Sequence, residues 1–348
     1  MNSLRIGILS TAGIARKNWR AINASGNSIV TAVASRDKAR AREFIRECQD
    51  ESPFDIFPDA VGSYEELLTR KDVNAVYIPL PTGVRKEWVI RAAAASKHVI
   101  CEKPCAVNAA DLEAMLAACR ENHVQFMDGV MFMHHPRMEK MRAALADRAS
   151  IGQLKRFTSA FTFNTAEEFY RDNIRVNSEL EPAGCLGDLG WYCLRFTLWA
   201  LNWQMPHEVT GRILSARGNA NSPAAAPTEF SGELFFDGGA SASFYCSFLV
   251  EKQQWVQASG TKGYLRLDDF VHPKNPLESG FELNGQVVPG EKSALKQDAH
   301  LFRNFARQIA SGQLNPDWPQ EALKTQQVLD ACLDSAWRGS PVKLESKL

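Results

Sequence analysis

Short apolar runs alternate with helix-like segments along the first 125 residues. Runs of strand length and composition lie at 4–9, 28–34, 75–78, 98–101 and 124–127. Segments with helical periodicity lie between or beside them, at 13–24, 37–48, 63–70, 86–95 and 111–122. Strands separated by helices are typical of right-handed βαβ units, which build a parallel sheet covered on both faces. The pattern therefore predicts a doubly wound α/β domain over residues 1–127.

The pattern changes after about residue 150 to longer strands in which polar and apolar residues alternate. These strands lie at 154–163, 229–236, 240–249, 254–259 and 264–267. Asp237-Gly238-Gly239 and Asn284-Gly285 are hairpin signals, and an insertion at 165–205 contains a helix. Two closing helices, at 298–311 and 319–338, each carry an apolar stripe. We predict an α+β domain over residues 128–348 with a large, mostly antiparallel open sheet.

Charge and composition exclude several classes of protein. Forty Lys and Arg residues balance forty Asp and Glu residues, and 45% of the chain is hydrophobic. This balance argues against a nucleic-acid binder, a polybasic membrane-surface protein and a disordered chain. No apolar run approaches the roughly 18 residues that cross a bilayer, and Arg5 and Gly7 already lie in the first strand rather than in a signal peptide. We expect a cytoplasmic protein.

The eight cysteines are scattered and form no C-x-x-C motif. Cys101 and Cys105 are four residues apart, but no histidine pair with ligand spacing lies near them. We expect buried or half-buried free thiols in a reducing compartment, and no metal.

A small-residue turn joins the first strand to the first helix. Against the fingerprint G-x-G-x-x-G/A, the three key positions of the segment Gly7–Ala15 hold Ser10, Ala12 and Ala15. Such a turn lets the backbone approach a pyrophosphate at the helix N-terminus, as in a Rossmann domain. The alternative is a tight turn that binds nothing. The residues predicted to contact the cofactor here are Ser10, Thr11, Ala12, Gly13 and Ile14.

The second strand ends in Ser35-Arg36-Asp37. A hydroxyl and a planar guanidinium suit the 2′-phosphate of NADP, which the guanidinium can grip bidentately. Two alternatives stay open: Arg36, Lys38 and Arg40 could be the solvated start of a helix, or Asp37 could turn inward and bind the ribose of NAD. We predict that Ser35 and Arg36 select NADP(H) over NAD(H).

Several motifs follow one another in a specific order. They are Tyr77-Ile78-Pro79-Leu80-Pro81-Thr82, Glu102-Lys103-Pro104 and Gly187-Asp188-Leu189-Gly190-Trp191-Tyr192. With the nucleotide turn, they make nearly the whole chain similar to the Gfo/Idh/MocA family of oxidoreductases. The segments 172–175 and 245–249 resemble the dihydrodiol-dehydrogenase-like branch most. This resemblance implies a Rossmann N-terminal domain and further cofactor contacts from Pro79, Leu80, Pro81 and Glu102.

The resemblance also implies the catalytic residues. Lys103 would lie beside the nicotinamide ring and help to move the substrate proton, and its peptide bond to Pro104 would be cis. Asp188 and Tyr192 are four residues apart on a predicted helix and share one face. Tyr192 would donate a proton to the substrate oxygen, with Asp188 orienting or contacting the substrate. The structural alternatives are an exposed strand-end lysine and a buried tyrosine beside a helix-start aspartate.

Four further residues are candidates for substrate binding. Asn173 and Arg175 precede the helix of Tyr192 and could cover a substrate, and His134 and Trp191 could line its pocket. Packing is the alternative for His134 and Trp191. One departure from the family pattern is Arg85, where a histidine often follows the Pro-x-x-x stretch.

These residues predict an NADP(H)-dependent oxidoreductase. It would transfer hydride between nicotinamide and a secondary alcohol or carbonyl of a small sugar, polyol or cyclic diol. Two alternatives share the fold: a non-catalytic NAD(P)-binding sensor, and a glycosidase that uses a tightly held NAD. The open face of the antiparallel sheet predicts a homodimer or a dimer of dimers.

Overall fold

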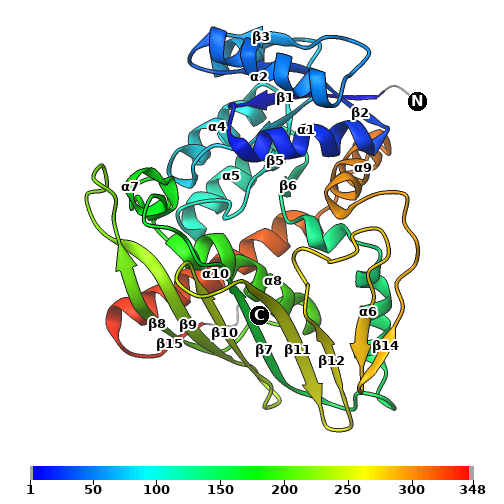
Figure 1. The fold of residues 1–348 in the computed structure, drawn as a ribbon, viewed down its shortest axis with the longest axis vertical. Helices are drawn as coiled ribbons and strands as arrows, with labels where there is room; N and C mark the ends of the chain where they lie inside the picture. Colours follow the sequence, from blue (N-terminus) through cyan, green and yellow to red (C-terminus); the bar gives the residue numbers. More distant parts are fainter. Residues whose placement is uncertain (1–2, 345–348) are drawn as a thin grey trace. The chain divides into compact units, whose positions relative to one another are not determined.

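Contacts within the chain divide the computed structural model, which describes residues 3–344, into two units (Figure 1). Unit 1 comprises residues 3–106, 110–135 and 294–322. Unit 2 comprises residues 107–109, 136–293 and 323–344. This division differs from the boundary predicted at 127/128, because residues 294–322 join the N-terminal unit. The boundary at 127/128 between the two domains stays a prediction. The helix predicted at 298–311 lies in unit 1, not with the C-terminal domain.

Unit 1 is built on a six-stranded parallel sheet with the strand order β3-β2-β1-β4-β5-β6. Its strands are β1 (Leu4–Leu9), β2 (Ser28–Ala34), β3 (Asp59–Val61), β4 (Ala75–Ile78), β5 (His98–Cys101) and β6 (Phe126–Asp128). Its helices are α1 (Gly13–Ser25), α2 (Lys38–Glu51), α3 (Tyr64–Thr69), α4 (Thr82–Ala94), α5 (Ala109–Glu121), η1 (Met131–His134) and α9 (Gln297–Ala310). This order is that of the doubly wound dinucleotide-binding fold, so the predicted Rossmann domain is confirmed.

The central strands of this sheet are apolar because helices cover both faces. All four residues of β4 are buried, as are five of the six in β1. Gly7 in β1 allows α3 to pack closely, since a Cβ there would lie 2.6 Å from Cδ2 of Leu67. At α3, Ser63 Oγ accepts a hydrogen bond of 3.1 Å from the Glu66 amide and so caps the helix.

Helix α9 completes unit 1 although it lies almost 300 residues along the chain. It packs against α1 and η1, which Figure 1 shows as an orange helix beside a blue one. Arg303 Nε donates to the Ser25 carbonyl at 2.7 Å, and Lys17 Nζ pairs with Asp298 at 3.1 Å. Phe302, on the apolar side of α9, lies edge-on to Tyr77 of β4 with ring centroids 5.9 Å apart. The helix therefore belongs to the hydrophobic core of the unit.

Unit 2 is built on a nine-stranded sheet with the order β14-β13-β12-β11-β7-β10-β9-β8-β15. Only β7 and β10 pair in parallel among these strands, so the predicted antiparallel sheet is confirmed. The strands are β7 (Leu154–Thr162), β8 (Glu208–Arg217), β9 (Ala226–Phe235), β10 (Ser241–Ser247), β11 (Gln253–Gly260), β12 (Tyr264–Leu267), β13 (Phe281–Leu283), β14 (Gln286–Val288) and β15 (Val342–Lys343). The helices are α6 (Arg137–Ala146), α7 (Phe169–Asp172), η2 (Ile174–Val176), η3 (Leu186–Gly190), α8 (Trp191–Ala200) and α10 (Asp317–Arg338), whose first residues through Ala322 count with unit 1.

Helices α8 and α10 supply the apolar cover of this sheet. Helix α8 is buried along its whole length and contacts β7 and β10. Helix α10 approaches β8 so closely that a Cβ at Gly211 would lie 2.0 Å from the Cys332 carbonyl oxygen. Arg195 of α8 donates from Nε to Thr325 Oγ1 of α10 at 2.8 Å. The two helices thus bind each other as well as the sheet.

Both hairpin predictions are confirmed. Strands β9 and β10 pair in antiparallel fashion across Asp237-Gly238-Gly239, and both glycines have positive φ, at 80° and 78°. Strands β13 and β14 turn at Asn284 and Gly285, where φ is 52° and 79°. The Asn284 and Gly285 values are those that a two-residue hairpin turn requires, and in the three-residue turn at 237–239 the two glycines supply the positive φ.

The eight cysteines are all buried free thiols, as expected. Burial raises the pKa of Cys48 to about 11 and that of Cys119 to about 12, which keeps both as unreactive thiols near neutral pH. Across residues 3–344, none of the helices combines the length and the apolar character needed to span a bilayer.

Candidate active site

The nucleotide turn of unit 1 leaves the start of α1 without a side-chain cap. Ala12 is the N-cap residue in an extended conformation, and its amide donates to Ser10 Oγ at 3.0 Å. Ser10 has φ 130°, a value that favours glycine, at the position where the fingerprint has its first glycine. A Cβ at the exposed Gly13 would meet no atom within 4 Å, so open space lies in front of the helix start. This cradle fits a diphosphate at a helix N-terminus.

The carboxyl end of β2 carries Ser35, which is buried, and Arg36, which is exposed. Asp37 caps α2: its Oδ1 accepts a hydrogen bond of 2.8 Å from the Ala39 amide. A carboxylate engaged as a helix cap is poorly placed to serve a ribose hydroxyl. Arg36 and Arg40 both act electrostatically on the Tyr64 hydroxyl at the start of α3, opposing the rise in its pKa that burial causes. Two guanidinium groups therefore gather at this edge of the sheet.

Lys103 follows β5, and its peptide bond to Pro104 is cis, as the resemblance implied. The neighbouring Glu102 is buried in a polar network. The Tyr77 hydroxyl donates to Glu102 Oε1 at 2.6 Å, and Asn18 Nδ2 donates to the same oxygen at 3.3 Å and to the Tyr77 oxygen at 2.6 Å. Burial, followed by the charge of Glu102, raises the pKa of Tyr77 well above its ordinary value, so this phenol stays a donor. Gly129 leaves room for the carboxylate, since a Cβ there would lie 3.0 Å from Oε1.

Arg85 is a buried side chain on α4, although helical patterning alone would place an arginine in solvent. Its Nε donates to the Leu80 carbonyl at 2.5 Å, and its Nη1 donates to the Glu102 carbonyl at 2.9 Å and to the Pro104 carbonyl. These contacts join the loop after β4 to the loop after β5. The predicted cofactor residues Pro79 and Leu80 are buried in the first of these loops, and Pro81 is the N-cap of α4.

Asp188 and Tyr192 of unit 2 are not on a single α-helix, which corrects the prediction. Asp188 lies in η3, a π-helical turn, and Tyr192 is the second residue of α8. A π-turn widens the helix without moving residues four apart to opposite faces, and such turns are frequent at functional sites. The ring of Tyr192 packs edge-on against Phe161 with centroids 5.6 Å apart, and only 7% of the residue is exposed.

Arg175 joins this group from the segment before η3. Its Nε donates to Asp188 Oδ2 at 2.7 Å, and its amide donates to Asn173 Oδ1 at 3.0 Å. The Asp188 charge raises the pKa of Arg175 more than burial lowers it, and Tyr192 adds a smaller electrostatic contribution. The structure therefore brings Asn173, Arg175, Asp188 and Tyr192 together within unit 2.

The other two predicted substrate residues have structural contacts. His134 Nδ1 lies 3.2 Å from Asn304 Nδ2 of α9, and its ring lies edge-on to Trp318. Its place in a substrate pocket stays a prediction. Trp191 has no exposed surface, and the Arg195 guanidinium lies 5.8 Å from the centre of its ring. Trp191 is thus packed within unit 2, and its contact with a substrate stays a prediction.

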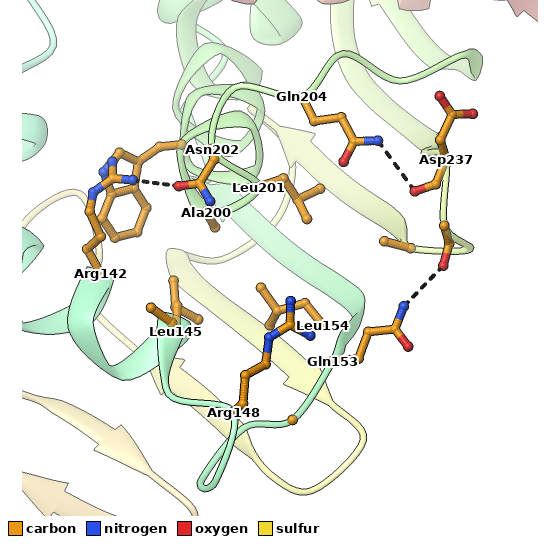
Figure 2. A pocket seen from close by; sticks show the side chains of 15 residues that line it. Arg142, Leu145, Arg148, Gln153, Leu154, Ala200, Leu201, Asn202, Gln204 and Asp237 are labelled. Atoms are coloured by element: carbon orange, nitrogen blue, oxygen red, sulfur yellow. Dashed lines mark hydrogen bonds between the residues drawn. The ribbon is translucent and has the colours of Figure 1, made fainter.

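Unit 2 also contains a cavity of about 380 Å³ between α6, the end of α8 and the β9–β10 hairpin (Figure 2). Arg142 stacks over Trp199 at 4.8 Å and donates to Asn202 Oδ1 at its rim. No lysine, tyrosine or histidine lines the cavity, and none of the predicted site residues does. It lacks the acid–base pair that the predicted chemistry needs.

Sequence reasoning missed three residues that shape the site in unit 1: Asn18, Tyr77 and Arg85. Tyr77 belongs to the motif Tyr77–Thr82, and Arg85 replaces a histidine that is frequent in the family. Only the structure shows that their polar groups meet around Glu102. Within residues 3–344, no group of three His, Cys, Asp or Glu side chains is arranged to hold a metal ion.

Comparison with known families identifies the class of protein. A model described as "Oxidoreductase family, NAD-binding Rossmann fold" matches residues 4–130, and the model of the Gfo/Idh/MocA C-terminal domain matches residues 138–266. Fold and family model thus define an oxidoreductase whose N-terminal domain is an NAD-binding Rossmann fold.

Two curated relatives and two solved structures add detail. The chain is 31% identical to D-xylose 1-dehydrogenase (NADP(+)) 2 of Haloferax volcanii over 98% of this chain and 100% of that protein. It is 34% identical to trans-1,2-dihydrobenzene-1,2-diol dehydrogenase of Bos taurus, covering 83% and 78%. A 3-ketoreductase from Actinomadura kijaniata, solved with NADP and TDP-benzene, is 25% identical with a TM-score of 0.81 over 96% of this chain and 98% of that one. An aldose-aldose oxidoreductase from Caulobacter crescentus shares the fold, with a TM-score of 0.84 at 23% identity over 99% and 100%.

The chain belongs to the Gfo/Idh/MocA family of oxidoreductases. It is an enzyme, an NAD(P)-dependent dehydrogenase or reductase. The likeness to dihydrodiol dehydrogenases that the sequence indicated is confirmed.

Proposed function

We propose that this enzyme transfers hydride between NADP(H) and a secondary alcohol or carbonyl carbon of a sugar, polyol or cyclic diol. The observation that carries the proposal is the placement of Lys103. It follows β5 at the same sheet edge as the nucleotide turn after β1, on a loop held by buried polar groups. The named activities of the relatives, on a sugar and on a dihydrodiol, support this substrate class.

The bound cofactor would supply or accept the hydride. The protein's own residues would handle the proton at the substrate oxygen. In reduction the Tyr192 hydroxyl donates its proton to that oxygen, and in oxidation it takes the proton back. Lys103 supplies a positive charge that favours the proton transfer. The proposal requires Lys103 of unit 1 and Tyr192 of unit 2 to act on one substrate.

Asp188 and Arg175 would orient the substrate. The ion pair fixes the Arg175 guanidinium, whose remaining N–H groups are suited to hydroxyl and carbonyl oxygens of a polyol. Asn173 holds the Arg175 main chain. Because Arg175 and Tyr192 interact electrostatically, a substrate bound to the guanidinium would lie close to the proposed proton donor. We also propose that His134, in η1 of unit 1, lines the substrate pocket.

The choice of NADP rests on the carboxyl end of β2. Arg36 and Arg40 have no ion-pair partner among the residues that the structure describes, and both act on Tyr64. Asp37, the acid that could have served NAD, is engaged as the cap of α2. Two free guanidinium groups beside Ser35 favour the dianionic 2′-phosphate over a ribose hydroxyl.

Substitution of Arg36 tests the cofactor choice. In Arg36→Gln the dissociation constant for NADPH should rise about 30-fold, the scale of a lost charge-assisted hydrogen bond of roughly 2 kcal/mol. The constant for NADH should change less than about twofold, since NADH has no 2′-phosphate. Calorimetric titration with both nucleotides measures this, and Lys38→Gln, a neighbouring exposed charge, is the control. Equal losses for NADPH and NADH would refute the assignment.

The substrate class is tested with a panel of sugars, inositols and trans-diols, monitored at the nicotinamide absorbance band with NADPH or NADP⁺. Turnover of at least one class is the expected result. Products that form without net change in NAD(P)H would indicate transient oxidation of a glycoside instead. No turnover of any member would contradict the proposed substrate class.

The assembly is also a proposal. One face of the sheet in unit 2 is covered by α8 and α10, and we propose that the other face pairs subunits into a homodimer or a dimer of dimers. Sedimentation velocity at micromolar concentration should show a species of two or four chains. A monomer there would contradict the proposal. We further propose a cytoplasmic location, which the buried free thiols suit.

A further inference from the structure

Arg85 has the contacts of a structural clamp rather than of a surface arginine. It lies in the first turns of α4 with 5% of its surface exposed. Its guanidinium donates to three main-chain carbonyls, those of Leu80, Glu102 and Pro104. Two of these carbonyls flank Lys103 in sequence. Thr82 Oγ1, one turn earlier on α4, also lies 3.5 Å from the Pro104 carbonyl.

The chemistry of the guanidinium explains why an arginine serves here. Carbonyl groups in a buried loop need donors, and an unpaired one costs free energy. The guanidinium offers five N–H donors in a rigid plane and stays charged at every accessible pH, so it can serve several carbonyls at once. A histidine has at most two ring N–H groups, and a lysine has no planar fork. Arg85 also acts electrostatically on the Tyr77 hydroxyl, which donates to the Glu102 carboxylate. The buried guanidinium of Arg85 and the buried carboxylate of Glu102 therefore belong to one polar network.

Two sets of contacts within this network therefore hold the residues around Lys103. Arg85 holds the main chain at Glu102 and Pro104. Tyr77 and Asn18 hold the side chain of Glu102, whose other oxygen accepts from the Lys103 amide at 3.3 Å. The Lys103 side chain, between these two clamped residues, is half-buried.

We propose that Arg85 is a positioning residue that fixes the direction of the Lys103 ammonium by clamping the main chain on both sides of it. This inference rests on the proposed function, in which Lys103 assists proton transfer. The inference gives Arg85, which stands where the family often has a histidine, a specific role in this chain.

The kinetic test uses two variants and one control. Arg85→Met should lower kcat roughly 10- to 50-fold, because a small misplacement of a catalytic group is enough to cost this much. The dissociation constant for NADPH and the KM for substrate should change less than about threefold. Arg85→Lys restores the charge without the fork, and should recover only part of the rate. Arg91→Met is the matched control on the same helix, since Arg91 is exposed and pairs with Glu87 and Glu65; it should leave kcat unchanged.

Hydrogen exchange of the backbone amides at 102–106 provides a readout that does not depend on turnover. Exchange there should quicken at least about tenfold in Arg85→Lys and Arg85→Met, while β1 and β4 keep wild-type protection. Unchanged exchange at 102–106 would overturn the clamp, even if kcat fell. A uniform rise across unit 1 in both variants would also overturn it, because Arg85 would then support only the fold. If the wild-type enzyme turns over no member of the panel, the proposed function fails while the exchange experiment still decides the role of Arg85.

Discussion

Replacing Lys103 with methionine should lower turnover at least about 100-fold, the scale of a lost acid–base group. Methionine keeps the length of the lysine stem, so the segment around Glu102 and Pro104 should fold as before. What disappears is the positive charge beside the reacting oxygen, which stabilises charge that develops there during proton transfer. Steady-state kinetics with a substrate found in the panel measures the effect. The loss should appear in kcat and in kcat/KM alike, because the charge matters most in the transition state.

The control for this variant is Lys86→Met. Lys86 is an exposed lysine on α4 that pairs with Asp111 at 2.6 Å, and an exposed pair contributes little. Its removal should leave turnover within about twofold of wild type. The dissociation constant for NADPH should stay within about threefold in both variants. Near-normal turnover in Lys103→Met would show that Lys103 is an ordinary residue at a strand end, and the proposed mechanism would fall with it.

An aspartate at position 12 should stabilise the fold and abolish most of the cofactor affinity. Ala12 is the N-cap of α1 and provides no side-chain cap. Aspartate is among the best N-cap residues, so Ala12→Asp should raise the free energy of unfolding by about 1 kcal/mol. The same carboxylate would face the pyrophosphate at the helix start. Repulsion of roughly 3 kcal/mol at short range corresponds to a dissociation constant for NADPH about 100-fold higher.

Urea denaturation without cofactor and calorimetric titration with NADPH measure these opposite effects. Ala12→Ser is the control, because serine caps the helix without adding charge; it should gain stability and keep NADPH affinity within about threefold. If Ala12→Asp binds NADPH as tightly as wild type, the diphosphate does not lie at the start of α1. If Ala12→Asp raises the free energy of unfolding but leaves the dissociation constant for NADPH unchanged, the proposed diphosphate site is unsupported.

The sequence predicted unit 1 well because its signals are local. The apolar runs give the central strands, and Asp37 and Ser63 cap their helices as their residue types suggest. The motif Glu102-Lys103-Pro104 indicated both the strand end and the cis peptide bond. The predicted strand at 124–127 begins two residues later, as β6. Strand β3 was missed because it is only three residues long, and just one of them is buried.

Contacts between distant segments explain what the sequence did not predict. Strand β8 was missed because Gly211 interrupts its apolar row, and the reason for that glycine is α10, more than 100 residues later. Helix α6 and strand β15 were missed. Strands β13 and β14 were indicated only by the turn at Asn284-Gly285 that joins them. The π-helical turn at Asp188 is a shift in backbone hydrogen bonding that side-chain periodicity does not record. Arg85 is a charged residue whose partners are carbonyl oxygens, and no residue pattern encodes those.

The position of α9 constrains how this protein can be made. Its side chains close the core beside α1, yet α9 spans Gln297–Ala310, so all the strands of unit 1 and the β-sheet of unit 2 up to β14 are synthesised before that helix leaves the ribosome. A nascent chain ending near residue 135 has every strand of the parallel sheet but lacks Phe302 against Tyr77. The parallel sheet of unit 1 therefore keeps part of its apolar surface uncovered until α9 has been synthesised.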